Sequence, residues 1–336
     1  MGAAYGVPGG VKVDTAQRYR RFAQFETHGH SPCYTDWSRR IADDTEVLAL
    51  VETLPAAKRQ PNLVLASARY VGARQGPFEE FKDFLIANWP LVRDVAMTHA
   101  TQTNEPARAA VLLPLFAEIA DPEPLYLIEI GASAGLCLYP DKYSYRYDDR
   151  PWLDPRAGPS PVRLSCETLG DPPVPERLPS VVGRVGVDLN PLDVTDAEHM
   201  RWLECLIWPE QQERLDRLHR AAAIARADPP EIIGGDLNDT IAELVHATPD
   251  NAPVVVFGSA VLAYLDADER ARFVETMRGL RCAWIANEGC GVVPVGRGLL
   301  PKPCSETRDR FVLTEDGVPV AYSGPHGQSL EWFRPG

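Results

Sequence analysis

From Leu125 onward, short apolar runs alternate with longer stretches of helical periodicity, and no other feature of the sequence constrains the fold as strongly. Each run is apolar along nearly its whole length, which is typical of a strand buried on both faces. A sheet whose strands alternate with helices is parallel and has right-handed crossovers. The predicted strands are 125–130, 184–189, 231–235, 253–258 and 282–287, and the predicted helices are 196–207, 209–227, 239–247 and 267–280.

The two ends of the sequence depart from this pattern. Residues 14–120 have helical periodicity, whereas FVLTEDGVPVAY (311–322) places two apolar runs around an Asp-Gly pair, which indicates a β-hairpin. LEWF (330–333) indicates one more strand. We therefore expect an α/β protein. A helical N-terminal region (1–120) caps a Rossmann-like, doubly wound and mostly parallel sheet (121–336) whose C-terminal edge strands are antiparallel.

A further segment interrupts the alternation soon after the first strand. A helix is expected directly after the strand 125–130, but Pro140 ends it early, because proline is tolerated only in the first turn of a helix. KYSYRYD (142–148) then alternates tyrosine with polar residues, and VRLSCETL (162–169) can pair with it. The sequence predicts a β-hairpin inserted at 140–180, with proline-rich flanks.

The composition of the chain indicates which partners the protein can have and in which compartment it is expected. The 34 basic and 47 acidic residues give a formal charge of -13, which argues against a nucleic-acid partner. No run approaches the roughly 18 apolar residues of a membrane helix, and the first ten residues lack the features of a signal peptide. The seven cysteines are scattered without zinc-site spacing. We expect a cytoplasmic protein with reduced cysteines, no metal and no membrane partner.

A cluster of small residues, GASAG (131–135), follows the first strand. It is either a simple turn or a backbone cradle for a nucleotide-like cofactor. Gly131 permits a sharp turn, and Gly135 permits close approach of the backbone to a ligand or a strand. A dinucleotide fingerprint needs glycine at 131, 133 and 136, so Ser133 and Leu136 weaken the nicotinamide and flavin interpretation.

Acidic residues end the next two predicted strands. Asp188 closes RVGVDL at a point where a carboxylate can accept both hydroxyls of a ribose, and Asp236 follows EIIGG in the corresponding place. A single Asp at such a position is more often a helix cap than a ligand. Together, and following a glycine turn, these acids favour a nucleoside site at one edge of the sheet.

These motifs resemble those of class I S-adenosylmethionine-dependent methyltransferases. EIGASAG resembles the first motif, with Glu129 in its acidic position, while GVDLNP and GGDLND are similar to the second and third, and VVVFGSAVLAYLDADERARF to the fourth strand and its helix. Over nearly its whole length the chain is similar to a bacterial family of uncharacterised proteins, domain of unknown function 2332, through SPCYTDW, IADD, TQTNEPAR, VDLNPLDVTD, AVLAYL, ANEG and GPHG. The 57 residues from Gly131 to Asp188 exceed the usual spacing of about 20, and we ascribe the excess to the insertion.

The resemblance implies roles for individual residues. The glycine turn lies against the methionine part of the cofactor, Glu129 orients the turn or the amino group, and Asp188 binds the ribose. TQTN (101–104) either binds the cofactor's carboxylate or caps the next helix through Thr103 or Asn104. The residues implied to bind the cofactor are Glu129, Gly131, Ala132, Ser133, Gly135, Asp188, Leu189, Asn190, Asp236, Leu237, Ser259, Gln102 and Thr103.

Catalytic candidates are fewer. Methyl transfer needs in-line approach and often a base, and His326 in SGPHG is the first candidate for that base, although a lone loop histidine is more often a surface residue. Tyr264 and Glu288, near the ends of the fourth and fifth strands, are the others. Tyr34 in SPCY is the candidate that contacts the substrate from the helical region.

The expected function is methyl transfer from S-adenosylmethionine to an unidentified small molecule. One alternative uses the same cofactor but attacks another sulfonium carbon, including intramolecular cyclisation that releases methylthioadenosine. The other alternative is a binding protein that keeps the cofactor pocket without turnover.

Overall fold

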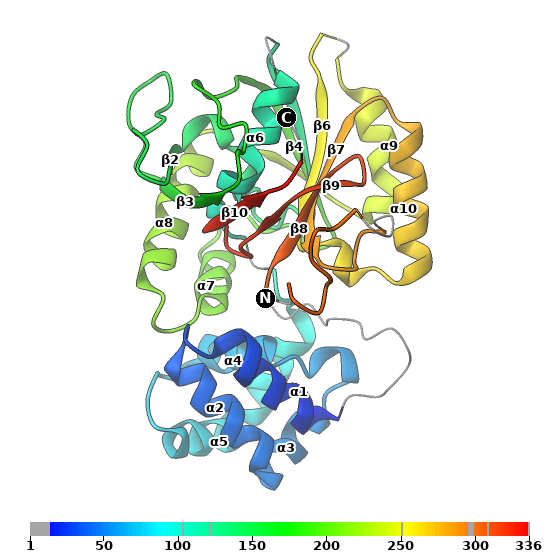
Figure 1. The fold of residues 1–336 in the computed structure, drawn as a ribbon. Coiled ribbons are helices and arrows are strands. Elements are labelled where there is room, and N and C mark those ends of the chain that lie inside the picture. Colours follow the sequence, from blue (N-terminus) through cyan, green and yellow to red (C-terminus); the bar gives the residue numbers. More distant parts are fainter. Residues whose placement is uncertain are drawn as a thin grey trace. The chain divides into compact units, whose positions relative to one another are not determined.

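A computed structural model describes residues 14–102, 104–120, 123–249, 251–294, 299–307 and 309–334 (Figure 1). The chain divides into two compact units. The helical unit comprises residues 1–103 and 195–216, and the sheet unit comprises residues 104–194 and 217–336. The sequence placed a single boundary at residue 120, whereas this division returns to the helical unit at 195–216.

The helical unit, coloured largely blue to cyan in Figure 1, is built from short amphipathic helices. Ser31 caps the second of them by accepting the Tyr34 N–H, and Asp44 caps the third. Trp37 stacks on Phe81 at 3.9 Å between ring centroids and fills the core of the unit. The helices are α1 (Thr15–Phe22), α2 (Pro32–Asp43), α3 (Thr45–Glu52), α4 (Pro61–Val71), α5 (Phe78–Thr98) and α7 (Ala197–Leu206), with short segments η1 (Ala23–Thr27) and η2 (Ala56–Lys58).

The sheet unit contains a ten-stranded, mostly parallel sheet of order β2-β3-β10-β9-β8-β7-β6-β1-β4-β5. The strands are β1 (Leu125–Ile130), β2 (Ser144–Tyr147), β3 (Arg163–Leu169), β4 (Val181–Asp188), β5 (Glu231–Gly234), β6 (Val254–Ser259), β7 (Ala283–Gly289), β8 (Phe311–Glu315), β9 (Val318–Ser323) and β10 (Ser329–Trp332). The helices are α6 (Ala109–Ala120), α9 (Leu237–Ala247) and α10 (Ala267–Gly279), and α8 (Gln212–Ala227) contains the division between the units. Short 3₁₀ segments are η3 (Pro106–Arg108), η4 (Leu136–Leu138), η5 (Pro140–Lys142) and η6 (Leu262–Tyr264).

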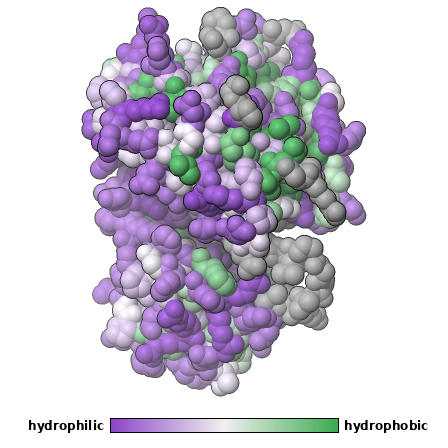
Figure 2. All heavy atoms as spheres, in the orientation of Figure 1, coloured by the Kyte–Doolittle hydropathy of each residue, from purple (hydrophilic) through white to green (hydrophobic). Residues whose placement is uncertain are grey.

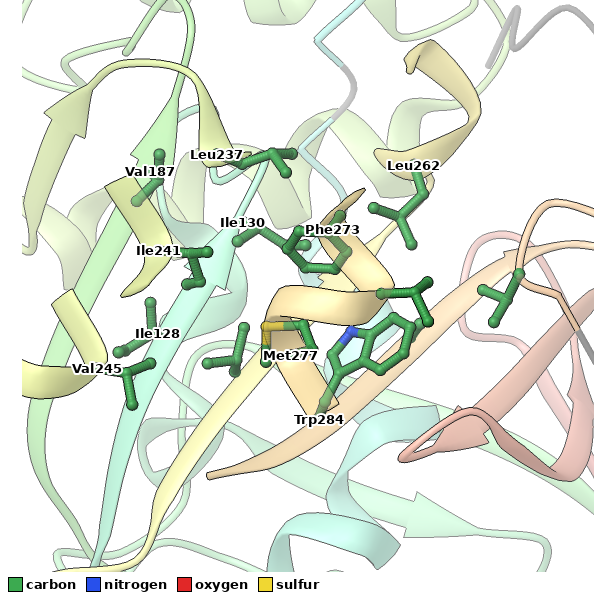
Figure 3. Packing of buried hydrophobic residues seen from close by; sticks show 14 of the residues in the cluster. Ile128, Ile130, Val187, Leu237, Ile241, Val245, Leu262, Phe273, Met277 and Trp284 are labelled. Atoms are coloured by element: carbon green, nitrogen blue, oxygen red, sulfur yellow. The ribbon is translucent and has the colours of Figure 1, made fainter. Parts of the chain in front are cut away.

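Both faces of the central strands are covered, as their continuous apolar runs predicted. On one face, side chains of β1, β6 and β7 pack against α9 and α10 around Phe273 and Trp284 (Figure 3). On the other face, α6 contacts β1 and β7, and Phe116 meets Phe257 edge-on at 5.1 Å. The face of the molecule seen in Figure 2 is mostly hydrophilic, in keeping with the net charge of -13.

Two details of the predicted sheet are wrong. The segment 140–180 contains two paired strands, but β2 and β3 run parallel, so they do not form a hairpin. Their connection of 15 residues is long enough for a parallel crossover. The C-terminal strands are antiparallel as predicted, but they lie inside the sheet, because β3 adds to β10 and makes β2 the edge.

The expectation of reduced cysteines is wrong for one pair. Cys290 and Cys304 form a disulfide with a Cα–Cα distance of 5.5 Å. The sequence offered no sign of it, because the pair has neither a close spacing nor an even cysteine count to suggest it. Within the described ranges, no helix is both long and apolar enough to span a bilayer.

Candidate functional site

The glycine turn lies where the order of the sheet reverses. After β1, the chain forms β2 and β3 at the far end of the sheet. It then adds β4 and β5 on one side of β1, and later β6 and β7 on the other side. In open α/β sheets, ligands bind beyond the carboxyl ends of the strands at this switch point. Residues 131–135 therefore occupy the expected place for a ligand site.

The turn has an unusual backbone. Gly131, Ser133 and Gly135 all have positive φ angles, of 65°, 53° and 69°. Serine rarely adopts this left-handed conformation, and such strain is found most often at functional sites. Gly131 is required for a second reason, because a Cβ atom there would lie 2.4 Å from the Val261 side chain. The turn is thus pressed against the segment that follows β6.

Asp188 joins the turn to the neighbouring strand. Its Oδ2 accepts the Ser133 N–H at 2.8 Å, and its Oδ1 accepts the Asn190 N–H at 2.8 Å. A carboxylate has about four acceptor sites and is a good partner for hydroxyl groups. The next two residues are exposed, and 69% of the Leu189 surface is accessible. An acid and an apolar side chain therefore stand open beside the glycine turn.

Asn104, which precedes the turn in the sequence, also holds it in place. Its Nδ2 donates to the Ala132 carbonyl at 3.1 Å, and its Oδ1 accepts the Leu136 N–H at 2.8 Å. The cap that the sequence suggested for Asn104 is therefore not its role. Its neighbour Thr103 lies outside the described residues. Gln102 belongs to the helical unit, where its N–H donates to the Ala100 carbonyl.

Asp236 and Leu237 have structural roles in their places after β5. Asp236 caps α9 by accepting the Asn238 N–H at 2.8 Å, which is the commoner role of a strand-end acid. Leu237 is 8% exposed and belongs to the same hydrophobic cluster as Ile130 and Val187 (Figure 3). Its side chain faces the core because it starts a helix that packs on the sheet.

Arg108 connects two loops that the sequence associated with catalysis. Its Nη1 donates to the Ser259 carbonyl at 3.0 Å, and its Nε donates to the Pro325 carbonyl at 3.0 Å. The loop that carries His326 is also pressed onto η3, because a Cβ at Gly327 would lie 1.9 Å from the Ala107 oxygen. The structure thus brings the His326 loop to the end of β6.

Two buried carboxyl groups flank this arginine. Glu129 is 5% exposed, and burial raises its pKa well above the usual range although the Arg108 charge opposes the shift. Glu288 is 1% exposed, and burial raises its pKa to about 7. Its Oε1 accepts the N–H groups of Val261 and Leu262 at 2.8 and 3.0 Å. Glu288 therefore anchors the segment after β6 and does not face open space.

The end of β6 also takes part in a chain of polar side chains. Asn287 Nδ2 donates to Ser259 Oγ at 3.0 Å, and Ser323 Oγ donates to Asn287 Oδ1 at 2.6 Å. Ser259 is half-buried, and Tyr264 in η6 is 51% exposed. The sequence analysis did not identify Asn287, Ser323 or Arg108. Arg108 could have been noticed, because it is a charged residue near the start of the apolar stretch 107–120.

Tyr34 does not present its side chain to any open site. It is 0% exposed within the helical unit, where its ring lies 6.0 Å from Trp37 and 6.2 Å from Trp208. Burial raises its pKa to about 12. Tyr34 lies on the buried face of α2, so the structure gives it a role in the core in place of the predicted contact with a substrate.

The site thus gathers the glycine turn, Asp188 and Leu189 at one side and the buried Arg108 group at the other. No curated protein matches the chain. Residues 16–332 match the family described as an uncharacterized protein conserved in bacteria, DUF2332. This match covers almost the whole sequence, and the chain belongs to the DUF2332 family.

Proposed function

We propose that the sheet unit binds S-adenosylmethionine at the 131–135 turn and transfers its methyl group to a small molecule. The observation that carries the proposal is the bond from the Ser133 N–H to the Asp188 carboxylate at the switch point of the sheet. This bond sets a partly exposed acid beside the turn, and a carboxylate suits the hydroxyl groups of a nucleoside's ribose. On this proposal, the order β5-β4-β1-β6-β7 is the Rossmann-like core of the sheet.

The segment after the turn favours a cofactor without phosphate groups. Dinucleotide sites place a pyrophosphate at the N-terminus of the helix that follows the glycine turn. Here the turn leads into the 3₁₀ segments η4 and η5, and the described residues from 131 to 143 contain no α-helix. Leu136, where a dinucleotide fingerprint needs its third glycine, is fully buried. S-Adenosylmethionine carries no phosphate and needs no such helix.

The two sides of the site suit the two ends of this cofactor. Leu189 is exposed next to Asp188 and offers an apolar face for the adenine ring. Glu129 lies two residues before Gly131 and has a buried oxygen, Oε2, for which the described residues provide no partner. A cationic ammonium or sulfonium group is well matched to such an oxygen.

The reacting groups belong on the β6 side. Ser259, Tyr264 and the His326 loop meet near the end of β6, and positioning of a nucleophile in line with the methyl carbon is the main requirement of the reaction. His326 remains the proposed base. Glu288 is better placed to hold the backbone of 261–262 than to touch a substrate.

Product analysis tests the proposal. The purified protein is incubated with S-adenosylmethionine alone and with pooled small metabolites, and both adenosyl products are measured by mass spectrometry. We expect S-adenosylhomocysteine only when an acceptor is present. If methylthioadenosine formed without an acceptor, and faster than by spontaneous breakdown, the reaction would be attack at another sulfonium carbon and not methyl transfer. Tight binding with neither product would favour the binding-protein alternative.

A further inference from the structure

Arg108 is a buried cation without an acidic partner. It is 4% exposed, and its side chain donates hydrogen bonds to the main-chain carbonyls of Ser259 and Pro325. No carboxylate of the described residues forms an ion pair with it. Two other arginines of the sheet unit do have such partners, since Arg184 pairs with Asp141 and Arg217 pairs with Glu105. Burial of an unpaired charge is costly, so the exception calls for an anion.

The two buried acids on which the Arg108 charge acts do not fill that role. The Arg108 charge lowers the pKa of both Glu129 and Glu288, but burial outweighs it and raises both values. Glu288 gives one oxygen to two backbone N–H groups, and the second oxygens of both acids have no partner among the described residues. The protein thus buries a guanidinium group together with two carboxyl groups that do not form an ion pair with it.

Arg108 also lies in the right place to meet a ligand of the glycine turn. Arg108 is the last residue of η3, and η3 contacts η4, which follows the turn. Asn104, just before η3, forms hydrogen bonds with the turn itself. The Nη1 of Arg108 reaches the end of β6, which is the strand beside β1. A guanidinium has five N–H donors in a planar fork, and two carbonyl contacts fix this fork while leaving donors for a further acceptor.

We propose that Arg108 binds the carboxylate of the ligand's amino-acid portion. The inference rests on the proposed function and deepens it. It states that Arg108 makes the protein prefer adenosyl ligands that carry this carboxylate over those that lack it. Two N–H groups of one guanidinium match two oxygens of one carboxylate, a geometry that lysine does not reproduce. The protein then prefers S-adenosylhomocysteine over methylthioadenosine, which lacks the whole amino-acid portion.

Calorimetric titration of the full chain with these two ligands tests the assignment. For Arg108→Lys, the affinity for S-adenosylhomocysteine is expected to fall about 10- to 100-fold, as for one lost charged hydrogen-bonded contact. The affinity for methylthioadenosine should stay within about threefold, because the adenosyl side of the pocket is untouched. Arg184→Lys is the matched control, since Arg184 also donates to a main-chain carbonyl, that of Leu138, and should leave the preference unchanged.

The outcomes separate this inference from the proposed function. Unchanged affinity for S-adenosylhomocysteine in Arg108→Lys overturns the inference alone, and so does an equal loss for both ligands, which would make Arg108 purely structural. Wild-type protein that binds neither ligand overturns both proposals. A test without any variant uses decarboxylated S-adenosylhomocysteine, and the inference fails if the wild-type protein binds it as tightly as the parent compound.

Discussion

The carboxyl edge of the sheet has an open half and a closed half. At the end of β4, Asp188 is partly exposed, and the next residues, Leu189 and Asn190, are exposed. Near the end of β7, Asn287 and Glu288 are at most 1% exposed. Both halves place polar residues where strands end, and no local sequence pattern distinguishes them. The comparison shows that burial separates the exposed residues at the end of β4 from Glu288, which holds the backbone of 261–262 in place.

The two halves meet at the glycine turn. Ser133 donates to Asp188 of the open half, while Gly131 lies against Val261, whose N–H is held by Glu288 of the closed half. The closed half therefore supports a turn that is itself largely buried and lies next to the exposed end of β4. Such support is what a binding constellation needs to keep its geometry.

Gly131→Ala should break this junction and have the largest effect. The new Cβ would lie 2.4 Å from the Val261 side chain at a φ of +65°, so strain and overlap add. We expect the free energy of unfolding to fall by roughly 3 kcal/mol or more, measured by urea denaturation. Gly158→Ala is the control, because its φ is +111° but nothing lies within 4 Å of its Cβ position. If both variants lost the same stability, the contact with Val261 would carry no weight.

How much of this arrangement the sequence predicts depends on the range of the interactions. The strands and their terminal acids follow from local periodicity, so β1, β4, β5, β6 and β7 appear close to their predicted places. The polar contacts that define the closed half join residues far apart in the chain. Arg108 donates to carbonyls 151 and 217 residues away, and β3 pairs with the distant strand β10. No local pattern encodes such partners.

Glu288→Gln tests the closed half through its pH dependence. The pKa of Glu288 is about 7 in the folded protein against 4.5 as the usual value, so the folded state keeps a proton that the unfolded chain loses between these pH values. Wild-type stability contributed by this group therefore falls as pH rises from 4.5 to 7, by about 3 kcal/mol in total. Glutamine keeps the Oε1 acceptor for Val261 and Leu262 and cannot ionise.

The variant should consequently be more stable than wild type at pH 8 and equal to it below pH 4.5, by thermal or urea denaturation. Glu331→Gln is a control of opposite sign, because hydrogen bonding to Lys302 lowers the pKa of Glu331 and its loss should destabilise the protein at pH 8. A difference between Glu288→Gln and wild type that is constant from pH 4 to pH 8 would show that Glu288 is not neutral in the closed half.

Asp188→Ala tests the open half. The variant removes the acceptor proposed for the ribose, and binding of S-adenosylhomocysteine should weaken by roughly 1.5–3 kcal/mol, as for a hydrogen bond to a charged group. Ligand-induced stabilisation measured by the melting temperature reports this loss, and NAD should give no stabilisation of the wild-type protein. Equal shifts with NAD, or full stabilisation of the variant, would remove Asp188 from the ligand site.

Asp236 gives the smallest expected effect and sharpens the boundary of the open half. Asp236→Ala removes a helix cap and should lower the free energy of unfolding by about 1 kcal/mol, whereas Asp236→Ser keeps a cap and should restore most of it. Both variants lack the carboxylate. If Asp236 bound the adenine amino group, the affinity for S-adenosylhomocysteine would fall equally in the two variants. Affinity that stays at the wild-type level in Asp236→Ser would assign Asp236 to the scaffold. The open half would then end at β4, because Leu237 beyond Asp236 is already part of the core.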